Sequence, residues 1–248
     1  MKFIFSLVLL LSVFNNASAQ EAERLWPDKN EDGKVGLMTS EKKIIVAHQY
    51  DAITRKTCDY SSHLIYITQI GDKYGIIDKW GNEIITPKYD AIELHSQSGD
   101  WIITKLDGKL GFAMFAWWNK EKGAPDVFES FPPLYDKIYW GGSEGSPSGF
   151  VTVTLGDKKG LVNERSGKEI TGMKYDYVSD FFFYQGHLWA EVGINGKHGL
   201  IDQNGTLVIP CEYDDINYIE GDGDLNDKIR VTKGDKEYFI NRKNQMVK

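Results

Sequence analysis

Short runs of alternating hydrophobic and polar residues, bounded by glycine turns, recur along this chain. The segments 150–155 and 229–232 alternate in this way, and a period of two residues predicts β-strands with one buried face. Two-residue turns such as Asn195-Gly196 join many of these runs. Asn-Gly and Asp-Gly favour type I′ hairpin turns, and Gly-Asp suits a type II′ turn. The pattern therefore predicts an all-β protein built from hairpins.

The hairpins form a repeat. Six turns are each followed by a lysine, and these lysines are 39, 36, 49, 39 and 39 residues apart. In five copies a glycine stands two residues after the lysine, and a Tyr-Asp pair follows later. The lysines are Lys34, Lys73, Lys109, Lys158, Lys197 and Lys236; the glycines are Gly36, Gly75, Gly111, Gly160 and Gly199; the pairs begin at Tyr50, Tyr89, Tyr135, Tyr175 and Tyr213. Self-similarity at such a period predicts a repeat architecture.

The fifth copy shows the content of one unit. Strands over 188–194 and 197–202 flank the first turn, and a second turn at 203–205 leads to a third strand over 206–214. A three-stranded meander of this size cannot bury its apolar face alone, so neighbouring units must stack. We expect tandem three-stranded meanders in an open, solenoid-like array, with a closed, propeller-like ring as the alternative. The sixth copy stops after its second strand and resembles a cap.

These repeats resemble the WG-repeat family, whose units read roughly G-K-W-G-[YFL]-I-D-x-x-G-x-x-V-I-P-x-x-Y-D. The fifth copy matches at nearly every place, and the resemblance covers about residues 32–248. It implies a repeat domain that binds or scaffolds other molecules. One departure is clear: the tryptophan that names the family is replaced in every copy, by Val35, Tyr74, Leu110, Lys159, His198 and Glu237.

The recurring lysine, tyrosine and aspartate predict structure rather than catalysis. A catalytic group is needed once, whereas a packing or pairing group is needed in every unit. We therefore expect the tyrosines in the core between repeats, and the lysines and aspartates in stacking or turn contacts.

An insertion in the third copy is the expected binding face. Between Gly111 and Tyr135 the usual gap of 14 or 15 residues becomes 24, and insertions in repeats often fall on the binding face. The segment Ala113–Pro133 carries the candidate binding residues Phe115, Trp117, Trp118 and Phe128. A second aromatic cluster comprises residues 181–184 and Trp189. These residues either pack in the core or form a platform on which a sugar or protein stacks.

The N-terminus predicts export. Met1–Ala19 has one charge, an apolar run of twelve residues over 3–14 and an A-x-A cleavage site at 17–19, as a secretory signal peptide does. The expected domains are a signal peptide over 1–19, an N-terminal segment over 20–31 and the repeat domain over 32–248. Cleavage after Ala19 would place the protein in the periplasm or outside the cell, with no further membrane span.

Net charge and cysteine content limit the classes of partner and the sources of stability. The formal net charge of −7 argues against nucleic acid, which requires a basic footprint. The two cysteines, Cys58 and Cys211, are too few for a disulfide framework, so stability must come from packing between repeats. In an open array these two cysteines lie too far apart to be joined, whereas a closed ring would bring their units together.

The motifs that suggest chemistry are weak. The G-x-S-x-G sequence at 141–145 is followed by Ser-Pro-Ser-Gly, so it lacks the helix that a nucleophile elbow needs. Two acidic loops have the first half of a calcium-binding loop but lack the glutamate at its twelfth position. Their candidate ligands are Asp28, Asn30 and Asp32, and Asp222, Asp224 and Asn226. We read both as solvated loops, with calcium as the one cofactor considered.

The sequence thus predicts an exported, non-enzymatic binding or scaffold protein that contacts a protein or glycan in the cell envelope. Two alternatives stay open. One is a glycan- or peptide-acting hydrolase with carboxylates in a groove, and the other is a calcium-stabilised, adhesin-like module.

Overall fold

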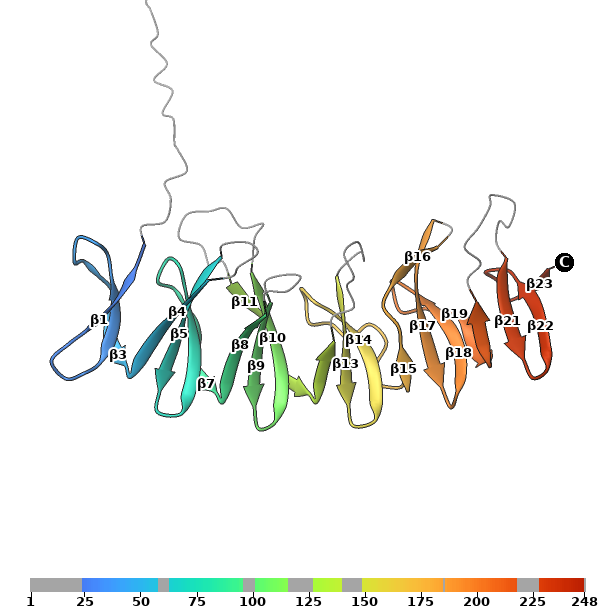
Figure 1. Ribbon diagram of the computed structural model, residues 1–248, viewed down its shortest axis with the longest axis horizontal. Coiled ribbons are helices and arrows are strands. Elements are labelled where there is room, and N and C mark those ends of the chain that lie inside the picture. Colours follow the sequence, from blue (N-terminus) through green and yellow to red (C-terminus); the bar gives the residue numbers. More distant parts are fainter. Residues whose placement is uncertain are drawn as a thin grey trace, which may run out of the picture.

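Six antiparallel β-sheets stand side by side in a row (Figure 1). The computed structural model describes residues 24–57, 63–95, 101–115, 127–139, 149–184, 186–217 and 228–247, and the regular elements over them are all strands. The first and sixth sheets lie at opposite ends of the row (Figure 1). The predicted all-β, open array is therefore confirmed, and the ring is not formed.

The sheets follow one another in sequence order. By sheet, the strands are β1 Trp26–Lys29, β2 Val35–Met38 and β3 Ile44–Tyr50; β4 Ala52–Thr57, β5 Leu64–Ile70, β6 Lys73–Asp78 and β7 Glu83–Tyr89; β8 Ala91–His95, β9 Trp101–Leu106, β10 Lys109–Phe115 and β11 Val127–Tyr135; β12 Lys137–Tyr139, β13 Phe150–Leu155 and β14 Lys158–Asn163; β15 Tyr177–Val178, β16 Phe182–Tyr184, β17 His187–Ile194, β18 Lys197–Asp202 and β19 Leu207–Tyr213; β20 Asp215–Asn217, β21 Ile229–Lys233, β22 Lys236–Ile240 and β23 Met246–Val247.

From the second sheet onward, each sheet begins with a strand that the sequence pattern does not predict. β4 begins directly after Tyr50-Asp51 and pairs with β5 of the following meander, and β8, β12, β15 and β20 occupy the same place in later sheets. A complete sheet is therefore four-stranded and runs from one Tyr-Asp pair to the next. The array also reaches beyond the expected boundaries, because β1 precedes residue 32 and β23 gives the sixth copy a third strand.

The first turns largely follow their predicted chemistry. Both central residues have positive φ at Asp107-Gly108 and at Asn195-Gly196, as type I′ turns require. In the Gly-Asp turns the leading glycine has positive φ, as at Gly71. The first copy is an exception: only Gly33 has a positive φ there, and the backbone of Asn30 pairs with that of Lys34 to close a longer loop. Its Asp-Gly sequence thus does not form the expected type I′ turn.

The repeated glycine after each lysine allows the third strand of the meander to cross close to the second. The register of β6 and β7 shifts across Gly75, between Tyr74 and Ile76, and again between Ile76 and Ile77, which marks a β-bulge. A Cβ atom on Gly75 would lie 2.4 Å from the carbonyl oxygen of Ile85. Glycine is therefore required here because a side chain would not fit, and not because the backbone has a positive φ.

Each pair of neighbouring sheets shares one hydrophobic cluster, and the tyrosine of each Tyr-Asp pair belongs to it. Tyr89, for example, packs with Ile65 and Ile76 of its own sheet and with Ile102 and Phe115 of the next. The five such tyrosines are Tyr50, Tyr89, Tyr135, Tyr175 and Tyr213, and all are buried. The prediction that they form the core between repeats is confirmed.

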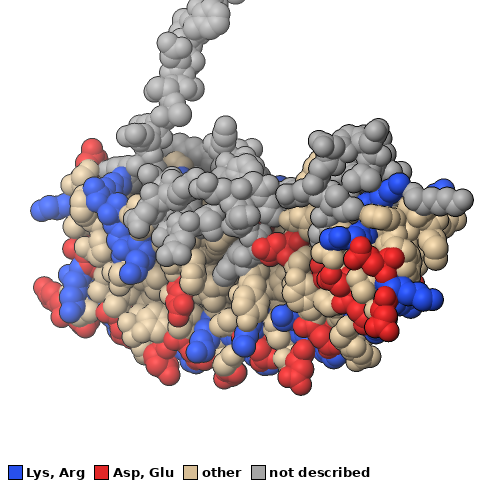
Figure 2. Space-filling model, turned by 45° about the vertical axis from the view of Figure 1, so that its right-hand side comes forward, with Lys and Arg blue, Asp and Glu red and all other residues tan. Residues whose placement is uncertain are grey.

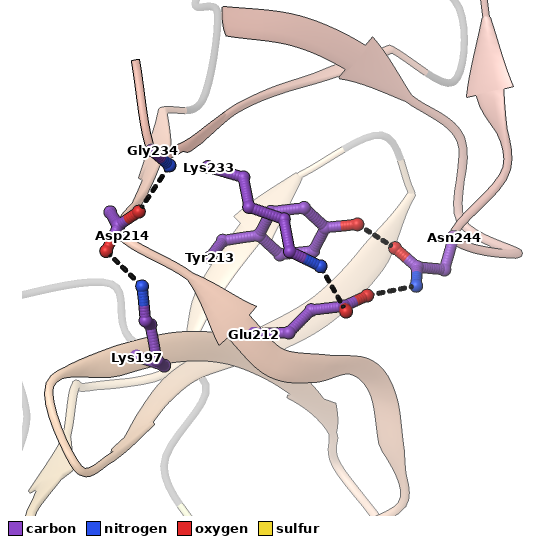
Figure 3. Close-up of polar contacts among 7 residues, drawn as sticks. All are labelled: Lys197, Glu212, Tyr213, Asp214, Lys233, Gly234 and Asn244. Atoms are coloured by element: carbon purple, nitrogen blue, oxygen red, sulfur yellow. Dashed lines mark hydrogen bonds and ion pairs between the residues drawn. The ribbon is translucent and has the colours of Figure 1, made fainter. Parts of the chain in front are cut away.

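The aspartate of each pair links two sheets. Oδ1 of Asp90 forms an ion pair with Lys73 of its own sheet at 2.5 Å. Its Oδ2 accepts a hydrogen bond at 2.9 Å from the backbone N–H of Asp107, in the first turn of the next sheet. We call this arrangement an aspartate clip. Five clips occur, at Asp51, Asp90, Asp136, Asp176 and Asp214, and Figure 3 shows the last of them between Lys197 and Gly234.

The tyrosine hydroxyls bind the second turn or third strand of the next sheet, with one exception. Tyr89 donates to Glu129, and Tyr135 donates to Glu169 at 3.2 Å. Leu207 occupies the corresponding position in the fifth sheet, so Tyr175 has no hydrogen-bond partner among the described residues although it is fully buried. Burial of this hydroxyl raises the pKa of Tyr175.

The missing partner gives a matched pair of substitutions. Tyr89→Phe should lower the free energy of unfolding by about 1 kcal/mol, because it removes a hydrogen bond to a carboxylate. Tyr175→Phe should leave stability unchanged or raise it slightly, since it removes a polar group that is already unsatisfied. Urea unfolding followed by fluorescence measures both. Equal losses in the two variants would show that the Tyr175 hydroxyl is bound after all.

The outer face of the sixth sheet carries a charged pair. Arg230 and Phe239 pair across β21 and β22 at the positions of Ile67 and Ile76 in the second sheet. The Arg230 guanidinium lies 3.7 Å from a carboxylate oxygen of Glu237. The fifth sheet, which is followed by another sheet, has the equivalent pair Glu191 and His198. Polar residues at these positions are thus shared with an interior sheet, and the role of the sixth copy as a cap stays a prediction.

Cys211 is a free thiol in the fifth sheet, in agreement with the open array, and Cys58 lies outside the described residues. Neighbouring sheets pack face to face through their shared hydrophobic clusters, an arrangement that typically spaces sheets by about 10 Å.

Candidate functional site

A groove lies between the fifth and sixth sheets. It has a volume of about 730 Å³, and it lies at the edge of the array opposite the aspartate clips. Three segments form its walls: the β16–β17 hairpin, the turn after β18 and the turn after β22. Its lining residues are Phe183, Gly186, His187, Leu188, Trp189, Asp202, Gln203, Asn204, Val208, Asn241, Arg242, Lys243 and Gln245.

One residue explains why the stack opens here. In the fifth sheet the second turn has Gly205, which packs so closely on the fourth sheet that an added Cβ would lie 2.6 Å from the carbonyl oxygen of Ile170. Gly81 of the second sheet packs on Ile45 in a similar way. The sixth sheet has Asn244 at this position, with φ of 58°. A side chain replaces the glycine, so this turn cannot approach the preceding sheet as closely.

The asparagine also fixes the turn over the groove. Tyr213 donates a hydrogen bond to Asn244 Oδ1 at 2.5 Å, and Asn244 Nδ2 donates to Glu212 at 3.0 Å (Figure 3). Lys233 pairs with the other carboxylate oxygen of Glu212 at 2.6 Å, and this contact holds the pKa of Glu212 below its ordinary value. The neighbouring Arg242 and Lys243 are therefore carried on an anchored turn.

An exposed aromatic side chain stands at the groove. Alternation along β16 packs Phe182 against the core between the fifth and sixth sheets and leaves Phe183 70% exposed, the most exposed phenylalanine recorded. Trp189 is buried beneath, with the His187 ring against it at 5.8 Å between centroids. The second aromatic cluster of the sequence thus divides between its two expected roles: Phe181 and Trp189 are core, while Phe183 is available for stacking.

The described lining residues carry more positive than negative charge. Arg242 and Lys243 are among them, and Arg242 contacts the His187 ring. The one acidic residue among them is Asp202, whose carboxylate already accepts N–H groups of Asn204 at 2.9 Å and Thr206 at 2.8 Å. By contrast, acidic and basic side chains intermingle along the clip edge (Figure 2).

The binding residues expected in the third-copy insertion do not form an exposed aromatic face among the described residues. Phe115 is 1% exposed and stacks on His63 in the core between the second and third sheets. Phe128 is half-buried and packs against the next core cluster. The insertion lengthens β10 and β11 instead, and Trp117 and Trp118 lie outside the described residues.

The first calcium candidate is a turn. The Asp28 carboxylate contacts His48 at 2.7 Å, and Asn30 Oδ1 accepts the backbone N–H of Lys34 at 2.8 Å. Within the described parts of the chain, no three His, Cys, Asp or Glu side chains gather as a metal site would require. Asp222, Asp224 and Asn226 of the second candidate lie outside these parts.

A hydrolase would need two close carboxyl groups in a cleft, one of them desolvated. Glu164 is desolvated, and its burial raises the pKa of its carboxyl group, but it does not line the groove. The G-x-S-x-G sequence at 141–145 and the signal segment at 1–19 lie outside the described residues. None of the described residues forms a helix long and apolar enough to cross a membrane.

Sequence reasoning missed the groove because its lining runs from Phe183 to Gln245, which lie 62 residues apart in the sequence. One signal was present: the second turn has Gly81, Gly167 and Gly205 in three earlier copies but Asn244 in the last. The first copy has Lys42 there, with φ of 63°, but no described sheet precedes it.

The fold and its junctions define a class: an open all-β repeat protein in which aspartate clips join successive sheets. The family model for the WG containing repeat matches residues 74–109, 160–197 and 199–236. The chain belongs to this WG-repeat family. The position of the missing family tryptophan pairs across the sheet with the buried tyrosine, as Tyr74 does with Tyr89 and His198 with Tyr213.

Similar solved structures are distant. They include dihydro-heme d1 dehydrogenase NirN in complex with DHE (12% identity, TM-score 0.29, covering 92% of this chain and 54% of that one). BamB from Moraxella catarrhalis is 11% identical with a TM-score of 0.27, covering 86% of this chain and 65% of that one. The chain thus spans less than two thirds of either structure, and such low TM-scores carry no functional argument. No curated protein sequence matches the chain significantly.

Proposed function

We propose that this protein is an exported, non-catalytic binding and scaffold module that holds a protein or glycan partner of the cell envelope in the groove between the fifth and sixth sheets. The groove is the observation that carries the proposal. Its volume of about 730 Å³ falls within the range of ligand sites, and it combines an exposed aromatic residue with a few polar groups, as such sites do.

The rest of the array supports a scaffold role. The aspartates of the Tyr-Asp pairs, which could otherwise act as catalytic carboxylates, are engaged in clips, and the tyrosines of these pairs are buried between sheets. Five repeated junctions make a stiff support, and recognition residues are often displayed on loops held by such a support. Export rests on the predicted signal peptide at Met1–Ala19.

The arrangement of charge favours binding over hydrolysis. Asp202 is the one acidic residue among the described lining residues, and its carboxylate is engaged by N–H groups of its own turn. Hydrolysis by paired carboxyl groups needs a second carboxylate near the first, and the described lining residues do not provide one.

Incubation of the protein with peptides and with glycan fragments of bacterial envelopes tests this function. Thermal unfolding reports binding, and mass spectrometry reports any product. We expect at least one saturable stabiliser, no cleavage of it, and loss of the stabilisation in Phe183→Ala. Tyr139→Ala is the matched control, because Tyr139 is also an exposed aromatic residue on a short strand, at 48% exposure, and lies outside the groove. Cleavage, or equal effects of both substitutions, would contradict the proposal.

A further inference from the structure

The groove provides three kinds of contact on separate elements. Phe183 of β16 presents an exposed ring. Gln203 and Asn204 come from the turn after β18, and both are exposed. Arg242 and Lys243 come from the anchored turn after β22. A ligand that uses all three must have an apolar face, hydrogen-bonding groups at its edge and a negative charge.

The amides favour hydroxyl groups as partners. The side chains of Gln203 and Asn204 have no recorded hydrogen bond among the described residues, in contrast to Asn241, whose Oδ1 accepts N–H groups of Lys243 and Gln245 at 2.9 and 3.0 Å. An amide both donates and accepts hydrogen bonds, and a hydroxyl does the same. A row of sugar hydroxyls therefore matches Gln203 and Asn204, while a carboxylate alone would use only their donors.

The cations favour a carboxylate on the same ligand. Lysine and arginine bind carboxylates through charge-assisted hydrogen bonds, which are shorter and stronger than neutral ones. The Arg242 guanidinium is oriented by its contact with His187, and Lys243 is exposed at the rim. The exposed Lys243 is therefore the cation that we expect to meet the ligand carboxylate first.

We propose, on the basis of the binding function above, that the groove binds an acidic oligosaccharide whose sugar rings carry carboxylates. One ring face stacks on Phe183, hydroxyls pair with the amides of Gln203 and Asn204, and the carboxylate lies at Lys243 and Arg242. The hydrogens on one face of a sugar ring are apolar enough to lie on the negative face of an aromatic ring. A neutral sugar lacks the charged contact, and an acidic peptide lacks the stacked ring with hydroxyls at its edge.

Calorimetric titration with trigalacturonic acid and with a hyaluronan hexasaccharide tests the ligand class. Galactotriose is the neutral comparison, and a trimer of aspartate is the peptide comparison. We expect at least one of the acidic sugars to bind at about 1 mM or below. It should bind about tenfold more tightly than galactotriose, the difference expected for one hydrogen bond to a charged group. Binding should weaken with added salt, because the contact is between exposed charges.

Two substitutions locate the site. Phe183→Ala and Lys243→Gln should each weaken binding about tenfold or more, while Tyr139→Ala and Lys137→Gln, both on β12, should leave it unchanged. Absence of binding by both acidic sugars, equal binding of galactotriose, or tighter binding of the aspartate trimer would overturn the proposed ligand. If another envelope polymer still stabilises the protein in a Phe183-dependent way, the binding function survives and only the ligand class fails.

Discussion

Replacement of Gly199 by alanine should destabilise the protein by about 2–3 kcal/mol, the upper part of the range for overpacking a filled site. The new Cβ would lie 2.5 Å from the carbonyl oxygen of Ile209 and 2.8 Å from the backbone nitrogen of Cys211. Both are backbone atoms of β19, at the bulge where β18 and β19 change register. Relief of the clash would have to move the strand and break its pairing.

Gly193→Ala is the control for this experiment. Gly193 lies on β17 of the same sheet, and its added Cβ would meet the Cβ of Tyr177 at 3.2 Å. This contact is only slightly too close, and a small shift of the two-residue strand β15 would relieve it. Urea unfolding of both variants should therefore show a small loss for Gly193→Ala and a large one for Gly199→Ala. Similar losses would show that the bulge tolerates a side chain.

Acidification should weaken all five aspartate clips together and unfold the array. The lysine of each clip, and then the N–H of the following turn, hold the pKa of Asp51, Asp90, Asp136, Asp176 and Asp214 below the ordinary value of 3.8. A carboxylate with a lowered pKa in the folded state stabilises that state at pH values above its unfolded pKa. This stabilisation is lost as the pH falls below 3.8 towards the folded-state pKa values.

Urea midpoints measured from pH 7 to pH 2 test the clips. Asp90→Asn keeps an oxygen for the Asp107 N–H but cannot ionise, so the variant should be less stable than the parent at pH 7 and should approach it in acid. Because the clips are partly exposed, the difference should be small for one clip and should shrink with added salt. A difference that persists unchanged at pH 2 would assign the loss to packing rather than charge.

Local patterns predicted the parts of this fold that depend on neighbours in sequence. Asn195-Gly196 requires a backbone conformation that few other residue pairs favour, so its hairpin was readable directly. The recurrence of tyrosine and aspartate predicted contacts between repeats, because only a structural role is needed five times. The open array followed from the size of each meander, which cannot bury its own face.

Features that depend on neighbours in space were not readable in the same way. β20 is three residues long, and its pairing partner β21 lies beyond residues 218–227, so its alternation alone is too short to predict a strand. Phe115 looked like an exposed aromatic residue on an insertion, but the longer β10 places it against the preceding sheet. The groove depends on Asn244, whose effect appears only when its turn meets the sheet before it.

The clips also define the segment by which such a protein can change its length. Residues 52–90 run from just after one Tyr-Asp pair to the end of the next, and they contain Lys73 and the carboxylate that will hold the following sheet. An in-frame duplication of this segment would add one sheet and one clip while leaving every other junction chemically the same. The number of repeats can therefore change from within the row without altering the contacts of the first or the sixth sheet.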